Sequence, residues 1–341
     1  MNIRQPLFFK KNRVRRIYTG GKHFADFFGE APSEGYFPEE WVCSCVRALN
    51  EGSTDENEGF SFLETGEKFA DVLEAHKVEM LGPDRDELGV LVKVLDSSIR
   101  LPAQVHPDKA FSRQHFNSEF GKTESWIILD TDEDACIHFG FNDHYTIEDL
   151  KAAFAAGGEA PAEMMNRILV KKGDVFLIPG KSVHAIGKGC LLLEVQEPTD
   201  FTIQPENTCG EYVLNDREKY IGLDPDVALS CFDMELVGEK AAMDLAWCTP
   251  VKDGDREVLI GYDRTPCFAV NRYTAEGGKI VSLPCPSIYV IVDGEGDVIR
   301  GDYRRAVKKG DYFFAPACIN GDLTVASETR LEIIECCLPK K

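Results

Sequence analysis

Four side chains with nitrogen or oxygen donors lie in three short motifs of this 341-residue chain. They are Gln104 and His106 in LPAQVHPD, Glu124 in GKTESW and His184 in PGKSVHA. Residues i and i+2 of a strand point to the same face, so Gln104 and His106 would project together. Two imidazoles, a carboxylate and an amide oxygen form a ligand set that suits zinc, and also manganese, iron or nickel. With fewer than four strong protein ligands, such a site keeps a position for water or substrate, as catalysis requires.

Each of these residues also has an ordinary interpretation. A single histidine is more often a surface or core residue than a ligand, Gln104 could cap a turn, and Glu124 could be a solvated loop acid. The five other histidines have no comparable neighbours and stay unassigned: His23, His76, His115, His138 and His144. Spacing alone therefore leaves the metal site as one hypothesis beside a purely structural one.

Short apolar runs between turn residues predict the strands that would carry these groups. Residues 175–178 form such a run between Gly-Asp and Pro-Gly pairs, and residues 190–195 form a second. His184 lies between these two strands, in an expected loop at their lip. Residues 90–95, VLVKVL, predict a further buried strand.

Two stretches predict helices. Apolar residues at helical spacing indicate a helix over residues 67–81. Thr146, followed by two acidic residues, has the pattern of an N-cap and predicts a helix that runs to residue 156 and ends at a Gly-Gly pair. We expect this helix to form a small insertion over about residues 146–166 of a strand-rich chain.

One internal repeat predicts the architecture. The segment VKKGDVF at residues 170–176 recurs as VKKGDYF at residues 307–313, and a proline follows each copy at the same offset. Two copies of one all-β unit predict two related barrels or sandwiches. No histidine follows His184 in the sequence. The second unit, over residues 251–341, is therefore expected to lack the metal ligands that the first unit, over residues 1–250, contains.

Composition and charge argue against some classes of function. The net charge of −20 argues against nucleic-acid binding, which favours a basic face. The twelve cysteines include pairs too close for ordinary disulfides and no paired C-x-x-C, so we expect reduced thiols. No stretch reaches transmembrane length, and the N-terminus lacks an apolar signal region. We therefore expect a cytoplasmic protein without membrane or nucleic-acid partners; the sequence leaves its oligomeric state open.

Together the three motifs resemble a known family. LPAQVHPD, GKTESW and GDVFLIPGKSVHAIGKGCLLLEVQEPTD are similar, in that order, to the type I phosphomannose isomerases, particularly their short bacterial form. The resemblance extends to segment 6–21 and to the C-terminal VKKGDYFFAP copy, so it spans most of the chain. It implies a mainly β fold with two cupin-type, jelly-roll-like barrels and a small helical insertion. It also implies zinc, or another divalent metal, and interconversion of mannose 6-phosphate and fructose 6-phosphate.

The resemblance also implies roles for individual residues. The zinc ligands of the family are matched by Gln104, His106, Glu124 and His184. Lys122 matches a lysine of the active-site cleft, where a cation suits a sugar phosphate dianion. Glu194 lies near the position at which the family has an active-site acid. Lys122 could instead be a solvated surface lysine, and Glu194 a structural carboxylate, because the second repeat keeps Glu332 without the ligand set.

Two positions depart from the family pattern. Gln204 stands where the family has a catalytic arginine, and glutamine offers neither a permanent charge nor a bidentate cationic fork. Four residues before His106 the family commonly has a serine near the phosphate, whereas Pro102 has no hydroxyl donor. Both departures fall where catalysis and phosphate recognition are expected.

Three hypotheses remain. The first is an isomerase of mannose 6-phosphate or a related sugar phosphate, with Lys122, Glu194 and Gln204 in the catalytic site. Its base could be Glu194 or a metal-bound water. The second is a metal-bound cupin that binds a carbohydrate without isomerising it. The third is another sugar-modifying cupin enzyme, such as a metal-dependent oxygenase or epimerase.

Overall fold

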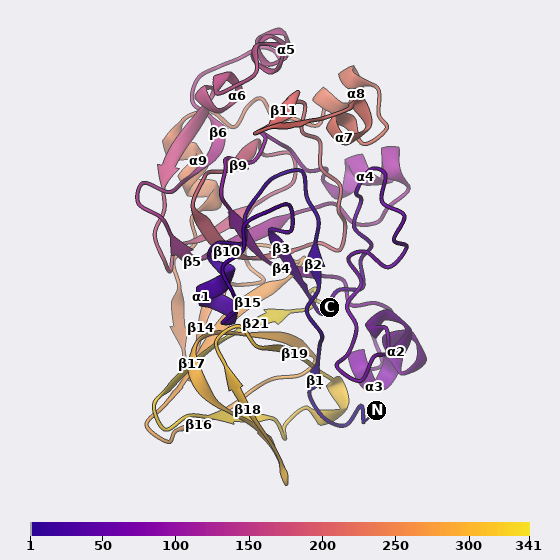
Figure 1. Cartoon of the computed structure of the whole chain (residues 1–341), viewed down its shortest axis with the longest axis vertical. Coiled ribbons are helices and arrows are strands. Elements are labelled where there is room, and N and C mark those ends of the chain that lie inside the picture. The colour runs from indigo at the N-terminus through magenta and orange to yellow at the C-terminus, as the bar shows by residue number, and fades with distance from the viewer. Residues whose placement is uncertain (1) are drawn as a thin grey trace.

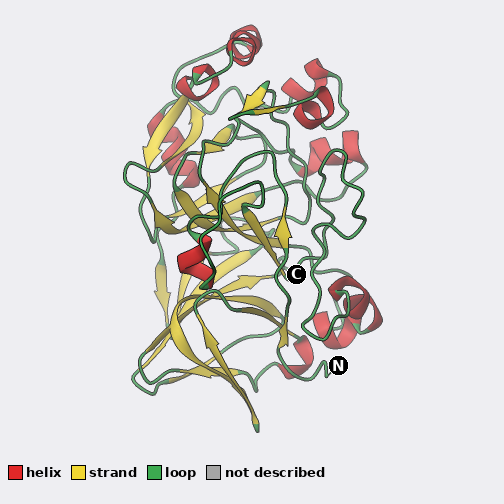
Figure 2. Ribbon diagram, in the orientation of Figure 1, coloured by secondary structure: helices red, strands yellow, loops and turns green. Residues whose placement is uncertain are grey.

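The chain folds mainly into antiparallel β-sheet, as Figures 1 and 2 show. The computed structural model describes residues 2–341. Within that range, every pairing between named strands is antiparallel. The predicted mainly β fold class is confirmed.

Two sheets of the N-terminal part carry two of the predicted ligands, Glu124 and His184. The larger has the order β2 (Arg13–Val14), β3 (Glu39–Val42), β4 (Leu91–Ser97), β10 (Cys190–Gln196), β5 (Glu124–Thr131) and β8 (Val175–Ile178). The smaller has the order β7 (Met165–Leu169), β6 (Cys136–Phe141) and β9 (His184–Ile186), and β11 (Thr208–Cys209) pairs separately with β12 (Tyr212–Val213). The strands predicted over 90–95, 175–178 and 190–195 are confirmed as β4, β8 and β10 of this sheet. The expectation of a loop at His184 is wrong, because His184 begins β9 opposite Phe139.

The C-terminal strands form a ten-stranded sheet. Its members are β1 (Leu7–Phe8), β13 (Val251–Asp253), β14 (Arg256–Ile260), β15 (Ala269–Glu276), β16 (Ile280–Ser282), β17 (Ser287–Arg300), β18 (Tyr303–Lys308), β19 (Tyr312–Ala315), β20 (Thr324–Ala326) and β21 (Arg330–Cys337). A single 3₁₀ turn, Ala317–Ile319, follows β19. β8 and β19 occupy matching positions in the two copies of the sequence repeat, so the repeat is also a structural one. β1 pairs with β19, and thus N-terminal residues complete the C-terminal sheet.

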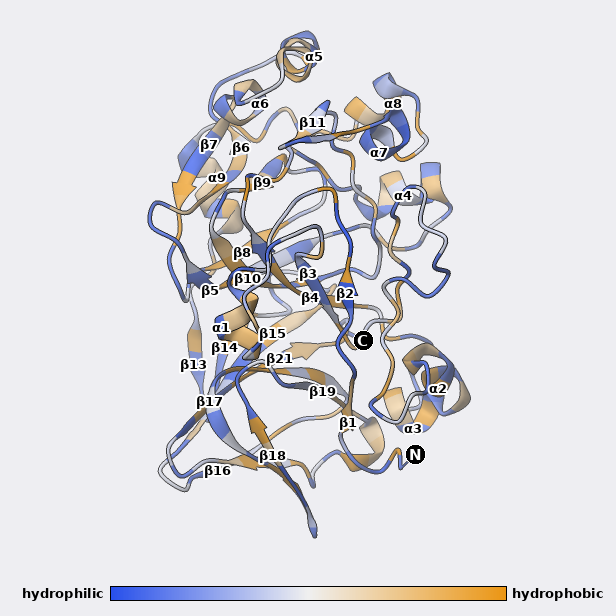
Figure 3. Cartoon of the chain, in the orientation of Figure 1, coloured by the Kyte–Doolittle hydropathy of each residue, from blue (hydrophilic) through white to orange (hydrophobic). Residues whose placement is uncertain are grey.

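The two large sheets share a hydrophobic core. Leu193 of β10 belongs to the same buried cluster as Val270 of the C-terminal sheet, whereas Leu192 packs in a second cluster with Trp126. Figure 3 shows hydrophobic segments along β15 and β21 in the middle of the molecule. Successive strand residues point to opposite faces. Glu194 therefore lies on the Leu192 face of β10, away from the shared core.

Short helices surround the sheets (Figure 2). They are α1 (Phe24–Phe28), α2 (Phe69–Ala75), α3 (Lys77–Leu81), α4 (Lys109–Phe116), α5 (Ile147–Ala156), α6 (Ala160–Glu163), α7 (Asp216–Tyr220), α8 (Pro225–Leu229) and α9 (Glu239–Ala246). The helix predicted over 67–81 is divided, because His76 leaves the helical region with φ −130° and ψ 34°. α5 is confirmed, with a capping box between Thr146 and Asp149. Among residues 2–341, no helix combines the length and apolar character needed to cross a membrane.

Replacing Leu193 with alanine is expected to lower the free energy of unfolding by about 2–5 kcal/mol, because a buried leucine leaves a cavity. Leu193 is 0% exposed in the shared core. Leu169→Ala is the matched control, since Leu169 is 60% exposed at the end of β7; its effect should stay within about 0.5 kcal/mol. Denaturant unfolding at fixed metal concentration measures both. Equal stability of the two variants would contradict the shared core.

Candidate active site and metal centre

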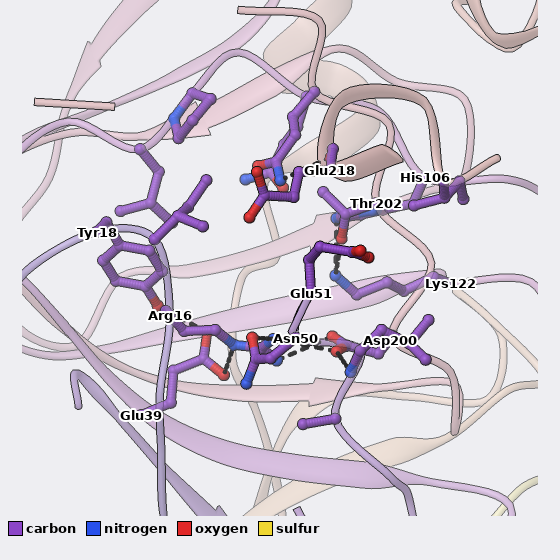
Figure 4. Close-up of a pocket in the computed structure, with 18 of the residues that line it drawn as sticks. Arg16, Tyr18, Glu39, Asn50, Glu51, His106, Lys122, Asp200, Thr202 and Glu218 are labelled. Atoms are coloured by element: carbon purple, nitrogen blue, oxygen red, sulfur yellow. Dashed lines mark hydrogen bonds and ion pairs between the residues drawn. The ribbon is translucent and has the colours of Figure 1, made fainter. Parts of the chain in front are cut away.

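A cavity of about 470 Å³ lies among the predicted site residues (Figure 4). Volumes of this order, roughly 300–1,000 Å³, are typical of small-molecule sites. Its lining includes Gln104, His106, Lys122, Glu124, Glu194 and Gln204. His184 is 1% exposed and contacts two of the lining residues, His106 and Glu124. The structure therefore brings all seven predicted site residues into one region.

Backbone pairing assembles the three motifs. Gln104 and His184 exchange two backbone hydrogen bonds, with N–O distances of 2.9 and 3.0 Å. Val105 exchanges two more with Ile203, at 2.9 and 3.0 Å. The extended segment that contains Gln104 is thus held from both sides. Glu124 begins β5, whose neighbours in the sheet are β8 and β10.

Three donor groups converge beside the cavity. The Nε2 atoms of His106 and His184 are 3.2 Å apart. The Glu124 carboxylate places Oε2 3.3 Å from His106 Nε2 and Oε1 3.4 Å from His184 Nε2. A tetrahedral zinc ion with nitrogen and oxygen ligands at about 2.0–2.1 Å separates those ligands by about 3.3–3.4 Å. The three measured separations fit donors that share one small divalent cation.

Hydrogen bonds at Nδ1 of both imidazoles fix the direction of their Nε2 atoms. His106 Nδ1 lies 2.9 Å from the carbonyl oxygen of Phe201, and His184 Nδ1 lies 2.9 Å from that of Ser182. A carbonyl only accepts, so each Nδ1 carries the N–H, and each Nε2 of a neutral ring keeps a lone pair. Such backbone contacts orient histidines that ligate metals. Two lone pairs and a carboxylate therefore face one point.

Electrostatics keeps these rings neutral. Burial lowers the pKa of His106 well below its usual value, and the nearby Lys122 and His184 lower it further. Burial also lowers the pKa of His184, although Glu124 opposes the shift. Glu124 Oε2 is fully buried and accepts no hydrogen bond from the residues described here. The Lys122 ammonium is 3.6 Å from this oxygen, beyond hydrogen-bond range, so the buried carboxylate can take a closer partner and a divalent metal fits this donor set.

Gln104 and Lys122 complete the surroundings of the three donors. Gln104 is 8% exposed and lines the cavity, as its i, i+2 spacing from His106 predicts. Its membership of the ligand set stays a prediction. Lys122 Nζ lies 3.1 Å from His106 Nε2 and 3.6 Å from Glu124 Oε2. The alternative of a solvated surface lysine is wrong, because Lys122 is 5% exposed.

A chain of buried charges extends from Glu194. Lys93 on β4 stands opposite Glu194 on β10, with Nζ 3.0 Å from Oε1. The same ammonium lies 3.8 Å from Glu39 Oε2. Arg16 Nε lies 2.9 Å from Glu39, and its two Nη atoms bind both carboxylate oxygens of Asp200 at 2.9 and 3.0 Å. All five residues line the cavity.

Sequence reasoning missed four members of this network: Arg16, Glu39, Lys93 and Asp200. One signal was available, since Lys93 interrupts the apolar run VLVKVL and a charge inside a buried strand requires a partner. Nothing local indicates that Arg16 pairs with Asp200, because 184 positions separate them in the chain. Only the fold brings these two segments together.

Gln204 lines the cavity but is bound to a neighbouring helix. Its Nε2 donates a hydrogen bond to the carbonyl oxygen of Glu218 at 3.2 Å, and its backbone nitrogen donates to that of Lys219 at 2.9 Å. Both acceptors belong to α7. The catalytic assignment of Gln204 stays a prediction.

Comparison with known proteins decides the family. No family model matches the chain. The mannose-6-phosphate isomerase ManA of Bacillus subtilis (strain 168) is 30% identical over 316 residues, which cover 92% of this chain and 93% of that protein. The chain belongs to the mannose-6-phosphate isomerase family. The resemblance indicated by the three motifs is thereby confirmed.

Other members of the mannose-6-phosphate isomerase family match over similar lengths. The mannose-6-phosphate isomerase of Streptococcus mutans is 28% identical over 331 residues, covering 94% of this chain and 97% of that protein. The crystal structure of the Bacillus subtilis mannose 6-phosphate isomerase has a TM-score of 0.75 at 23% identity, covering 96% of this chain and 99% of that one. A mannose 6-phosphate isomerase structure bound with zinc and yttrium has a TM-score of 0.70 at 16% identity, covering 98% and 100%. These structures share the fold of this chain.

We expect the His184→Ala variant to lose stoichiometric divalent metal, because it removes one of three converging donors. His138→Ala is the matched control, since His138 is also buried, at 8% exposure, and lies outside the donor cluster. Elemental analysis after dialysis against zinc at neutral pH measures both. Full metal content in the His184→Ala protein would rule out this centre.

Proposed function

We propose that this chain is a divalent-metal-dependent isomerase that interconverts mannose 6-phosphate and fructose 6-phosphate. The observation that carries the proposal is the convergence of His106, Glu124 and His184 beside a cavity that Glu194 also lines. Membership of the family adds support, because the match to relatives named mannose-6-phosphate isomerase covers nearly their whole length.

The reaction moves a proton between neighbouring carbons of the open-chain sugar. A proton leaves C2 and one returns at C1 through a cis-enediol, while the C1 carbonyl becomes a hydroxyl and the C2 hydroxyl becomes a carbonyl. When bound, a divalent metal polarises the oxygens on which negative charge develops. The chain must itself supply a base for the carbon-bound proton and a cation near the oxygens.

Glu194 is the carboxylate that we assign to the proton. It is 3% exposed and lines the cavity. Burial raises the pKa of Glu194, the nearby Glu124 raises it further, and Lys93 opposes the shift. A base with a raised pKa can both accept the proton and return it near neutral pH. Lys122, buried beside the metal donors, is the cation that would face the enediolate oxygens.

Zinc is the metal that we propose for the centre. Support comes from the nitrogen and oxygen donors, from their tetrahedral spacing, and from a structural neighbour that holds zinc. Gln104 would be the fourth protein ligand, because it lines the cavity beside His106. Other divalent metals accept the same donors.

The finer architecture and the location are also proposals. We propose two cupin-type barrels, one for residues 1–250 with the insertion near 146–166 and one for residues 251–341 without metal ligands. Support comes from the structural match of the two repeat copies.

We propose a cytoplasmic location, which the twelve free cysteines of the described chain support, because reduced thiols are typical of that compartment.

Conversion of mannose 6-phosphate to fructose 6-phosphate by the zinc-loaded protein is the first test. We expect turnover that chelation abolishes and added zinc restores. A fully metallated protein without turnover would instead support carbohydrate binding without isomerisation, the alternative that Gln204 favours. Gln204→Arg is then the informative variant, since it restores a guanidinium at that position.

Glu194→Gln is expected to lower kcat by about 10²–10⁴, because an amide cannot accept the carbon-bound proton. Glu332→Gln is the control: Glu332 is the glutamate of the Leu-Glu-Ile segment in the second repeat, and it is paired with Arg272 and Arg330 outside the cavity. Steady-state kinetics with zinc content measured in parallel separates catalysis from metal loss. An unchanged kcat in Glu194→Gln would show that another group is the catalytic base.

A further inference from the structure

The cationic side chains of the cavity fall into two groups. Three are buried and bound to acids: Arg16 to Glu39 and Asp200, Lys93 to Glu194, and Lys122 to Glu124. Arg16 and Lys93 balance buried carboxylates, and Lys122 is already assigned to the enediolate oxygens, so none of the three is left for the substrate's phosphate. The remaining cations that line the cavity are Arg47 and Arg217.

Arg47 and Arg217 are exposed, so they lie at the open end of the cavity. They come from separate segments, the loop after β3 and helix α7. Arg47 makes no ion pair or hydrogen bond within residues 2–341. Arg217, with a side chain 77% exposed, places Nε 3.1 Å from Glu51 Oε2. Both guanidinium groups are therefore available to an incoming anion.

We infer that Arg47 and Arg217 form the subsite for the substrate's phosphomonoester dianion, and that Glu51 occupies Arg217 until the phosphate displaces it. The inference rests on the proposed function. Glu51 also lines the cavity and lies among its side chains in Figure 4. Exposed ion pairs are weak, whereas guanidinium groups bind phosphate through paired, charge-assisted hydrogen bonds. Replacement of Glu51 by the substrate's phosphate at Arg217 is therefore favourable.

The surroundings of Arg217 support the exchange. The neighbouring acid Glu218 is already bound, since its carboxylate accepts hydrogen bonds from the Tyr212 hydroxyl at 2.6 Å and from Asn215 N at 2.9 Å. Gln204, which has no charge, is hydrogen-bonded to the helix that bears Arg217. α7 thus supplies a guanidinium group, that of Arg217, to the part of the cavity near Gln204, whose own side chain is uncharged.

The chain's net charge strengthens the case. At −20 the protein as a whole repels an anionic substrate. Exposed cations at the mouth of a cavity counter that repulsion locally, because clefts concentrate the field of the charges that line them. A rim arginine should therefore affect substrate capture more than the proton transfer.

Steady-state kinetics of the zinc-loaded full chain tests the subsite. Arg217→Ala and Arg47→Ala should each raise the KM for mannose 6-phosphate by about tenfold or more, as expected for the loss of a hydrogen bond to a charged group. They should raise KM more than they lower kcat. Glu51→Gln should change KM in the opposite direction, because it frees Arg217. Arg113→Ala is the control: Arg113 is an exposed arginine paired with Glu119 outside the cavity, and its removal should change neither constant.

Inhibition by inorganic phosphate provides the second measurement. Its inhibition constant should rise in both arginine variants and fall in Glu51→Gln, whereas turnover of unphosphorylated mannose should not respond. If the wild type has no isomerase activity, calorimetric binding of mannose 6-phosphate to the same variants still tests the subsite separately from the proposed function. Unchanged KM, inhibition and binding in both arginine variants would overturn the inference.

Discussion

The centre of this molecule is a concentration of negative potential that requires a cation. Two neutral imidazoles direct their lone pairs at each other across 3.2 Å, and a buried carboxylate points to the same place. The carbonyl oxygens of Phe201 and Ser182 hold the rings in this orientation. The Lys122 ammonium lies beside this cluster, but without a cation shared by all three donors the arrangement would be repulsive and poorly satisfied. A divalent metal removes that repulsion, which explains why three distant motifs can be packed so closely.

The fold surrounds this centre with balanced charge. Lys93 between Glu194 and Glu39, and Arg16 between Glu39 and Asp200, form an alternating row of cations and anions along one side of the cavity. Burial alone would lower the pKa of Lys93, but Glu194 and Glu39 raise it and keep the ammonium charged. Breaking such a row leaves an uncompensated buried charge. The network can therefore hold Glu194 in place while leaving the carboxylate facing the cavity.

Local sequence was sufficient for the parts of the structure that depend on local physics. Apolar runs between turn residues located β4, β8 and β10, and the Thr146 cap located α5. The i, i+2 spacing placed Gln104 and His106 on one cavity wall. Local sequence failed where tertiary contacts decide. His184 joined a strand because Phe139 pairs with it, and the apolar periodicity over 67–81 continues through His76, where the helix breaks. Arg16 and Asp200 meet only because the N-terminal segment packs against the chain after β10.

The second repeat copy clarifies what belongs to the scaffold. β19 reproduces β8, and Glu332 stands in a strand equivalent to that of Glu194. Among the described residues of that copy, however, Glu332 pairs with arginines near the surface and has no histidine partner. The repeated segments thus specify strands, and the chemistry depends on the few residues that differ between the copies.

X-ray absorption at the zinc edge of the metal-loaded chain tests the central claim most directly. Two imidazoles and oxygen ligands predict a first shell of nitrogen and oxygen at about 2.0–2.1 Å, with multiple scattering from two imidazole rings. The chain has twelve cysteines, so a thiolate site is a real competitor. A sulfur shell at about 2.3 Å, or the absence of imidazole scattering, would contradict a centre built from His106, Glu124 and His184.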